Sequence, residues 1–164
     1  DGYNGESGDV VLAFSGPPRL DRCAAPEDCG AGRQCLSELC VPATPADCAG
    51  ALPAEGPGPF VGDTSMLQDR LSPGCVGLSN APEAIYAFVS PVNGTFVAST
   101  AGSAFDTVLY VLGGCVDELV CNDDSGAGTT SSVRFDAVAG QVYYVVVDGY
   151  SNRSGAYNLT IQAQ

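Results

Sequence analysis

The densest group of oxygen-bearing side chains in the sequence is the run NDDSG at residues 122–126. Ca²⁺ is bound in proteins by oxygen atoms from carboxylates, amides and carbonyls, and clustered Asp beside a permissive Gly suits that need. The same residues are also ordinary turn formers whose side chains bond to nearby amides. Two further carboxylates stand where predicted strands begin or end. The candidate calcium ligands are therefore Asp106, Asp123, Asp124 and Asp148.

Catalytic chemistry has few residues to work with, because the chain contains no His and no Lys. The usual Ser-His, Cys-His and Ser-Lys nucleophile pairs cannot be built from it. Asp106 with Asp123 or Asp124 is the carboxylate pair to consider for glycoside cleavage. No Trp is present to stack on a sugar, and the chain is short for a deep cleft. We predict a protein that is not an enzyme and has no catalytic residues.

The charge balance excludes several classes of partner. The formal net charge is −13, and all six basic residues are Arg. Nothing in such a chain would neutralise the phosphates of a nucleic acid or an anionic membrane surface. No apolar run is long enough to span a bilayer. We therefore expect neither a nucleic-acid partner nor a membrane span.

The eight cysteines predict a disulfide framework. Their even number, their close spacing and the absence of His fit four disulfides in an oxidising compartment, whereas zinc would require CxxC-type pairs. In the cluster CAAPEDCGAGRQCLSELC we expect the interleaved pairs Cys23–Cys35 and Cys29–Cys40, although spacing alone leaves other pairings open. The first residue is Asp and no signal-type segment follows, so we expect a mature secreted protein, extracellular or on a cell surface. The eight are Cys23, Cys29, Cys35, Cys40, Cys48, Cys75, Cys115 and Cys121.

The elements that position these residues are predicted to be strands. Short runs rich in β-branched and aromatic residues alternate with Gly, Pro and Asn turns, which predicts an antiparallel, jelly-roll-like β-sandwich. Several runs are apolar on both faces and should lie in the centre of a sheet. We expect a sandwich over 47–164, a disulfide-rich module with a linker over 17–46, and an extension over 1–16. The predicted strands are 84–90, 94–100, 106–112, 118–122, 131–138, 141–148 and 156–162.

Residues 9–15 read as an additional strand that has no partner nearby in the sequence. Val10, Leu12 and Phe14 would lie on one face, and Val11 and Ala13 on the other, so both faces are apolar. Such a strand either packs back on its own sandwich as an edge strand or adds to the sheet of a neighbouring copy. The second arrangement, repeated head to tail, gives a filament.

Three stretches resemble one known family, the bacterial pre-peptidase C-terminal domain. They are FDTVLYV at 105–111, CNDDSGAG at 121–128 and YYVVVDGYSNRSGAYNLTI at 143–161. The resemblance implies a compact β-sandwich of a secreted protein, in a family where some members bind collagen, polysaccharide or calcium. It also implies the pairs Cys48–Cys75 and Cys115–Cys121. Residues 28–35, DCGAGRQC, are similar to small Dickkopf-like and myxobacterial disulfide modules, which implies no chemistry.

Two functions from different classes remain open. The first is a structural subunit that self-assembles through residues 9–15, with Val10, Val11, Leu12, Ala13 and Phe14 as the partner-binding residues. The second is a monomeric extracellular adhesion module that binds a glycan or a matrix protein. Four tyrosines in the last hairpin are candidates for a ligand face, although their strand context favours packing. They are Tyr143, Tyr144, Tyr150 and Tyr157.

Overall fold

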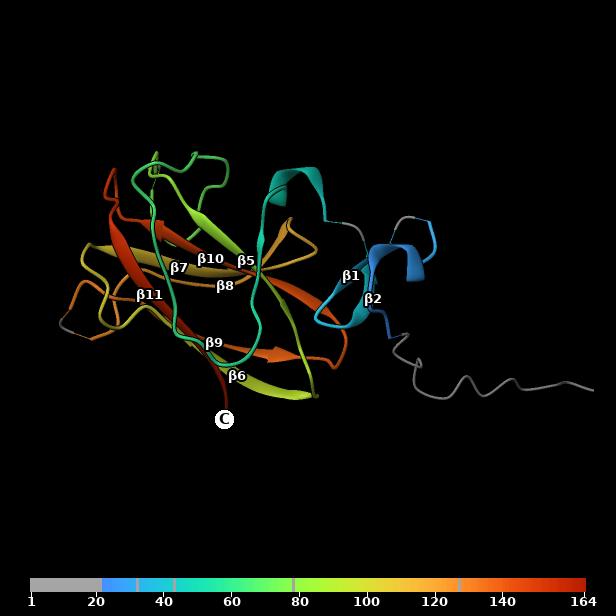
Figure 1. Cartoon of the computed structure of the whole chain (residues 1–164). Coiled ribbons are helices and arrows are strands. Elements are labelled where there is room, and N and C mark those ends of the chain that lie inside the picture. The colour runs from blue at the N-terminus through green and yellow to red at the C-terminus, as the bar shows by residue number, and fades with distance from the viewer. Residues whose placement is uncertain (1–21, 32, 43, 78, 127) are drawn as a thin grey trace, which may run out of the picture.

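The computed structural model describes residues 22–31, 33–42, 44–77, 79–126 and 128–164. Two β-sheets pack face to face, and a two-stranded hairpin lies beside them (Figure 1). The helical elements in these ranges are two short 3-10 turns, Pro26–Asp28 and Ala46–Cys48, and no helix described there is long and apolar enough to cross a membrane. The predicted all-β sandwich is confirmed.

The first sheet has five strands in the order β3-β5-β10-β7-β8, and the second has four in the order β4-β11-β6-β9. Neighbouring strands are antiparallel, except that β3 runs parallel to β5. The five are β3 (Leu52–Pro53), β5 (Ala84–Val89), β10 (Val142–Gly149), β7 (Thr107–Gly113) and β8 (Asp117–Asn122). The four are β4 (Phe60–Asp63), β11 (Ala156–Ala163), β6 (Gly94–Ser99) and β9 (Ser132–Ala137).

The sequence pattern predicted the long strands closely. Each run predicted between residues 84 and 162 is a strand whose ends lie within about one residue of the expected positions, which is inside the usual uncertainty of strand ends. Strands β3 and β4 were missed. Both are short and contain or adjoin Pro and Gly, so neither shows the alternation of apolar and polar residues that indicates a strand.

Strand β10 shows why a strand can be apolar on both faces. It lies between β5 and β7 in the middle of its sheet. Tyr143, Val145 and Val147 face the core between the two sheets, whereas Tyr144 and Val146 belong to a second apolar cluster on the opposite face. The expectation that this segment is a central strand covered on both sides is confirmed.

The core between the sheets is built around aromatic rings. Phe88 and Phe96 lie with their ring centroids 5.0 Å apart, and Phe135 packs 6.0 Å from Phe96. The buried hydroxyls of Tyr86 and Tyr157 hydrogen-bond to each other at 2.9 Å. Rings from both sheets thus fill the space between the layers.

The outer face of the five-stranded sheet is covered by the chain itself, and we call it the covered face. Leu71 and Val76, in the long connection from β4 to β5, pack against its apolar cluster. That connection is tied down by polar contacts as well: the Ser79 hydroxyl donates to the carbonyl of Gly149 at 2.9 Å. The Gly74 amide donates to Glu118 Oε2 at 2.7 Å.

The disulfides confirm half of the predicted pairing and correct the other half. Cys23–Cys35 and Cys29–Cys40 are present as predicted. The pairs Cys48–Cys75 and Cys115–Cys121, which the family resemblance implied, are wrong, because the bonds are Cys48–Cys115 and Cys75–Cys121. Cys115 lies at the turn that precedes β8 and Cys121 lies near the far end of that strand. A strand rises about 3.3 Å per residue, so these two cysteines are too far apart to bridge. Each bonds instead to a segment that covers the sheet.

The disulfide-rich module is organised by a hairpin of β1 (Arg33–Leu36) and β2 (Leu39–Pro42), which form a sheet of their own. The two residues of its turn, Ser37 and Glu38, have positive φ values of 49° and 61°, as a tight hairpin turn requires. Leu36, just before the turn, packs against the apolar cluster of the covered face. The turn is therefore held against the sandwich.

Candidate functional site

Three of the four predicted calcium ligands come together in the structure. Asp106 immediately precedes β7, and Asp123 and Asp124 follow β8. The two strands are antiparallel neighbours, so the start of one and the end of the other meet at the same edge. One carboxylate oxygen from each of these residues lies within 4.8 Å of the others.

This acidic cluster has the chemistry of a cation site. Asp123 Oδ1 is buried and has no hydrogen-bond partner among the described residues. Burial raises the pKa of the Asp123 carboxyl, and the neighbouring carboxylates of Asp124 and Asp106 raise it further. A hard cation would supply the missing partner and offset the repulsion. Turn chemistry is present too, since the Asn122 side-chain amide donates to the Asp124 carbonyl at 3.1 Å.

Asp148 is not part of that cluster. It lies on β10 and is fully buried. Its Oδ1 accepts a hydrogen bond from the Gly149 amide at 2.6 Å, and its Oδ2 accepts one from the Tyr110 hydroxyl at 3.3 Å. Both oxygens of Asp148 thus accept hydrogen bonds on the covered face. They are not free to join the other three carboxylates in binding a cation.

Asp148 has a second buried acid nearby, which the sequence did not single out. Glu83 precedes β5 and is only 4% exposed, and both of its oxygens accept from the Arg70 amide, at 3.0 and 3.2 Å. Burial raises the pKa of Glu83 to about 7, with Asp69 adding to the rise. Burial likewise raises the pKa of Asp148 to about 7, and Glu83 adds to it. The covered face therefore contains two acids that titrate near neutral pH.

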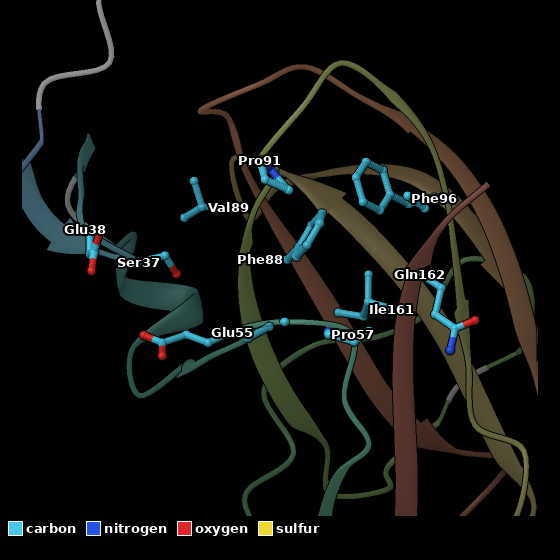
Figure 2. Close-up of a pocket in the computed structure, with 13 residues that line it drawn as sticks. Ser37, Glu38, Glu55, Pro57, Phe88, Val89, Pro91, Phe96, Ile161 and Gln162 are labelled. Atoms are coloured by element: carbon cyan, nitrogen blue, oxygen red, sulfur yellow. The ribbon is translucent and has the colours of Figure 1, made fainter.

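An apolar groove lies where the two sheets separate, beside the hairpin of the module (Figure 2). Its cavity volume is about 590 Å³. Phe88 from β5, Phe96 from β6 and Ile161 from β11 lie on the sandwich side, and Ser37 and Glu38 lie on the module side (Figure 2). We call this opening the seam. Its remaining lining residues are Ala54, Glu55, Gly56, Pro57, Val89, Pro91, Gln162 and Ala163.

Both sheets have an open edge at the seam. Strand β3 pairs with β5 at Tyr86 and Ala87 and does not extend along the last two residues of β5. Strand β4 pairs with β11 over residues 156–159 and does not reach residues 162–163. Over the described part of the chain, no strand pairs with these two edges on the side of the seam. Each edge presents backbone groups to which an added strand could bond.

The module forms one wall of the seam and adds an unpaired hydroxyl to it. The Ser37 Oγ is buried and has no hydrogen-bond partner in the described ranges. Ser37, Glu38 and Glu55 also line a second, more polar cavity of about 770 Å³ on the module. The two cavities therefore share a wall. The predicted additional strand, residues 9–15 with Val10, Val11, Leu12, Ala13 and Phe14, lies outside the described residues.

The tyrosines of the last hairpin pack instead of forming a face for a ligand. Tyr143, Tyr144 and Tyr157 are all buried. The Tyr143 hydroxyl accepts a hydrogen bond from the Val138 amide at 2.9 Å. Tyr150 is the exposed member of the group, at 46%. The packing interpretation of these residues is confirmed for the three that are buried.

No family model matches the chain, and no curated protein matches it. Among solved structures, it is similar to the pre-peptidase C-terminal domain of collagenase from Bacillus anthracis, with 15% identity and a TM-score of 0.48 over 68% of this chain and 94% of that one. It is also similar to PliG from Aeromonas hydrophila, a periplasmic inhibitor of g-type lysozyme. Here the identity is 12% and the TM-score 0.46, over 70% of this chain and 96% of that one. The first of these is the kind of domain that the sequence motifs resemble.

Proposed function

We propose that this protein is a secreted, non-catalytic structural subunit that assembles into an extracellular filament. In the assembly, residues 9–15 of one copy enter the seam of the next copy as an added strand. The observation that supports this most directly is the seam itself, an apolar groove flanked by two open sheet edges. A filament is the expected product, because a donor segment and an acceptor groove at different places on one chain make a head-to-tail contact.

The chemistry of the donor matches that of the acceptor. An added strand bonds through its main chain to a sheet edge and buries alternate side chains in pockets. Val10, Leu12 and Phe14 fall on one face of such a strand, and the sandwich side of the seam is lined by Phe88 and Ile161 among others. Each large apolar side chain buried in this way contributes roughly 1.5–3 kcal/mol.

The remaining features suit a durable polymer outside the cell. Four disulfides are typical of an oxidising compartment. The net charge of −13 makes copies repel one another and so opposes assembly unless part of it is offset. We further propose that Asp106, Asp123 and Asp124 bind calcium, which would offset part of that charge and supply a partner to the unpaired Asp123 oxygen.

The test is electron microscopy of the purified protein beside two variants and a control. Deletion of residues 1–16 removes the donor, and Ala163→Asp places a charge at an exposed residue that lines the seam. Thr160→Asp, on the same strand but not among the seam residues, is the control. We expect filaments from the natural sequence and from the control, and none from the two variants.

Two results would overturn the proposal. Filaments formed equally well without residues 1–16 would show that strand addition is not the mechanism. A monomer at every concentration, together with specific retention on a glycan or matrix-protein surface, would instead establish the alternative function of an adhesion module. A peptide of residues 9–15, added to the deletion variant, should raise its melting temperature only if the seam accepts that strand.

A further inference from the structure

The N-terminal 21 residues, which we call the arm, join the rest of the chain at the wall of the seam. Arg22, the residue next to the N-terminal 21 residues, pairs with Leu39 as an isolated β-bridge. Its side chain forms an ion pair with Glu38 at 3.0 Å. The Cys23 amide donates to the Glu38 carbonyl at 3.0 Å. The chain is thereby fixed to the turn that lines the seam.

The arm is long enough to turn back into that seam. Phe14 precedes Arg22 by eight residues, and an extended chain of that length reaches about 26 Å. The two cavities share Ser37, Glu38 and Glu55, so a continuous surface leads from Arg22 to the apolar part of the seam. A segment tethered this closely has an effective concentration in the millimolar range, well above that of a separate copy in dilute solution.

We propose that, before assembly, residues 9–15 occupy the seam of their own chain, and that filament growth exchanges them for the same residues of a neighbour. This inference rests on the proposed function. Exchange of an identical element between copies preserves its contacts and is a low-cost route to assembly. The monomer would then keep its apolar groove covered until the concentration favours exchange.

The side chains along the path fit this arrangement. The apolar run 10–14 would lie against Phe88, Phe96 and Ile161, and the buried Ser37 hydroxyl would gain a main-chain partner. Arg19 is the one basic residue in the stretch 9–21, and the exposed carboxylate of Glu55 lies on the wall shared by the two cavities.

Hydrogen exchange of the dilute, monomeric full chain tests the inference. The amides of Val89 and Ala163 point away from the paired neighbours β10 and β6, so they report on the two open edges. We expect these amides to exchange at least about tenfold more slowly in the full chain than in Phe14→Asp or Leu12→Asp. The matched control is Ser7→Asp, which adds the same charge outside residues 9–15 and should leave the protection in place. The midpoint of urea denaturation should confirm that every variant is folded.

The outcomes separate this inference from the proposed function. Equal exchange at the two edges in the dilute full chain and in both apolar-to-Asp variants would overturn the inference, even if concentrated protein forms filaments. Protected edges at dilution that depend on Phe14 and Leu12 would support it, even if no filament ever forms and the proposed function fails.

Discussion

Two apolar regions of this protein, the covered face and the seam, differ in how completely the described chain covers them. The covered face of the five-stranded sheet lies under the β4–β5 connection and is fastened by Cys48–Cys115 and Cys75–Cys121. The seam is apolar as well, yet it is lined on its far side by the module turn at Ser37 and Glu38 and encloses about 590 Å³. Phe88, Phe96 and Ile161 at the base of the seam are buried in the core. What the described chain leaves open at the seam is the groove above them and the two strand edges beside it.

The difference indicates what kind of feature the seam is. An open sheet edge favours aggregation unless a specific partner covers it. The edges at the seam are open because β3 and β4 are short and end before their neighbours β5 and β11. The two surfaces should therefore respond differently when the contacts that complete each of them are removed.

The largest expected effect on the free energy of unfolding comes from removing a disulfide of the covered face. Replacing Cys48 and Cys115 together by Ala opens a crosslink with a sequence separation of 67 residues. Loss of a loop closure of that length should lower the free energy of unfolding by about 4 kcal/mol, which urea denaturation would measure. As the control, replacing Cys23 and Cys35 by Ala should leave the unfolding of the sandwich nearly unchanged. No loss on replacing Cys48 and Cys115 would show that the covered face does not depend on this disulfide, and an equal loss from both pairs would show that the module and the sandwich unfold together.

The next effect concerns the two buried acids of the covered face. The folded-state pKa values of Glu83 and Asp148 are raised to about 7, from 4.5 and 3.8 respectively. The folded protein thus holds more protons than the unfolded chain between about pH 4 and pH 7. The contribution of these groups to the free energy of unfolding should fall as the pH rises through that window, and level off above it.

Urea midpoints measured from pH 4 to pH 8 would check this dependence. Glu83→Gln should flatten the slope, because the amide cannot ionise and can still accept from the Arg70 amide. Glu55→Gln, an exposed acid at the seam, serves as the matched control and should leave the slope unchanged. A full slope in Glu83→Gln would contradict the assignment.

A smaller effect is expected from calcium at the acidic cluster. At about ten times its dissociation constant, a ligand that binds only the folded state contributes about 1.4 kcal/mol. For a chain of this size, that corresponds to a rise in melting temperature of roughly 3–6 °C. Differential scanning calorimetry with calcium and with chelator should show this rise in the natural sequence and not in Asp123→Asn. An identical melting temperature in chelator and in calcium would rule out the site.

The smallest effect should come from the ion pair at the root of the arm. Arg22 and Glu38 have side chains that are 78% and 77% exposed, so Glu38→Gln should change the free energy of unfolding by at most about 1 kcal/mol. If urea denaturation gave a larger loss, the module turn would have to be counted as part of the fold of the sandwich and not only as a wall of the seam.

Local patterns in the sequence determined much of this protein. Alternating apolar residues predicted the strands from 84 to 162, because side chains in a strand point to opposite faces in turn. The module pairs Cys23–Cys35 and Cys29–Cys40, with separations of 12 and 11 residues, were also predictable from a compact cluster. Turn and strand-end positions singled out Asp106, Asp123, Asp124 and Asp148, and the first three of these come together in the structure.

Features that depend on contacts between distant segments were decided only by the tertiary structure. The bonds Cys48–Cys115 and Cys75–Cys121 join segments 67 and 46 residues apart, and no spacing rule selects them. Asp148 lies outside the acidic cluster, and its oxygens accept hydrogen bonds from the Gly149 amide and from Tyr110 on the neighbouring strand. The seam has open edges because the short strands β3 and β4 end before their neighbours β5 and β11. The order of the strands brings these two edges to the same groove. The periodicity of a single strand does not encode that order.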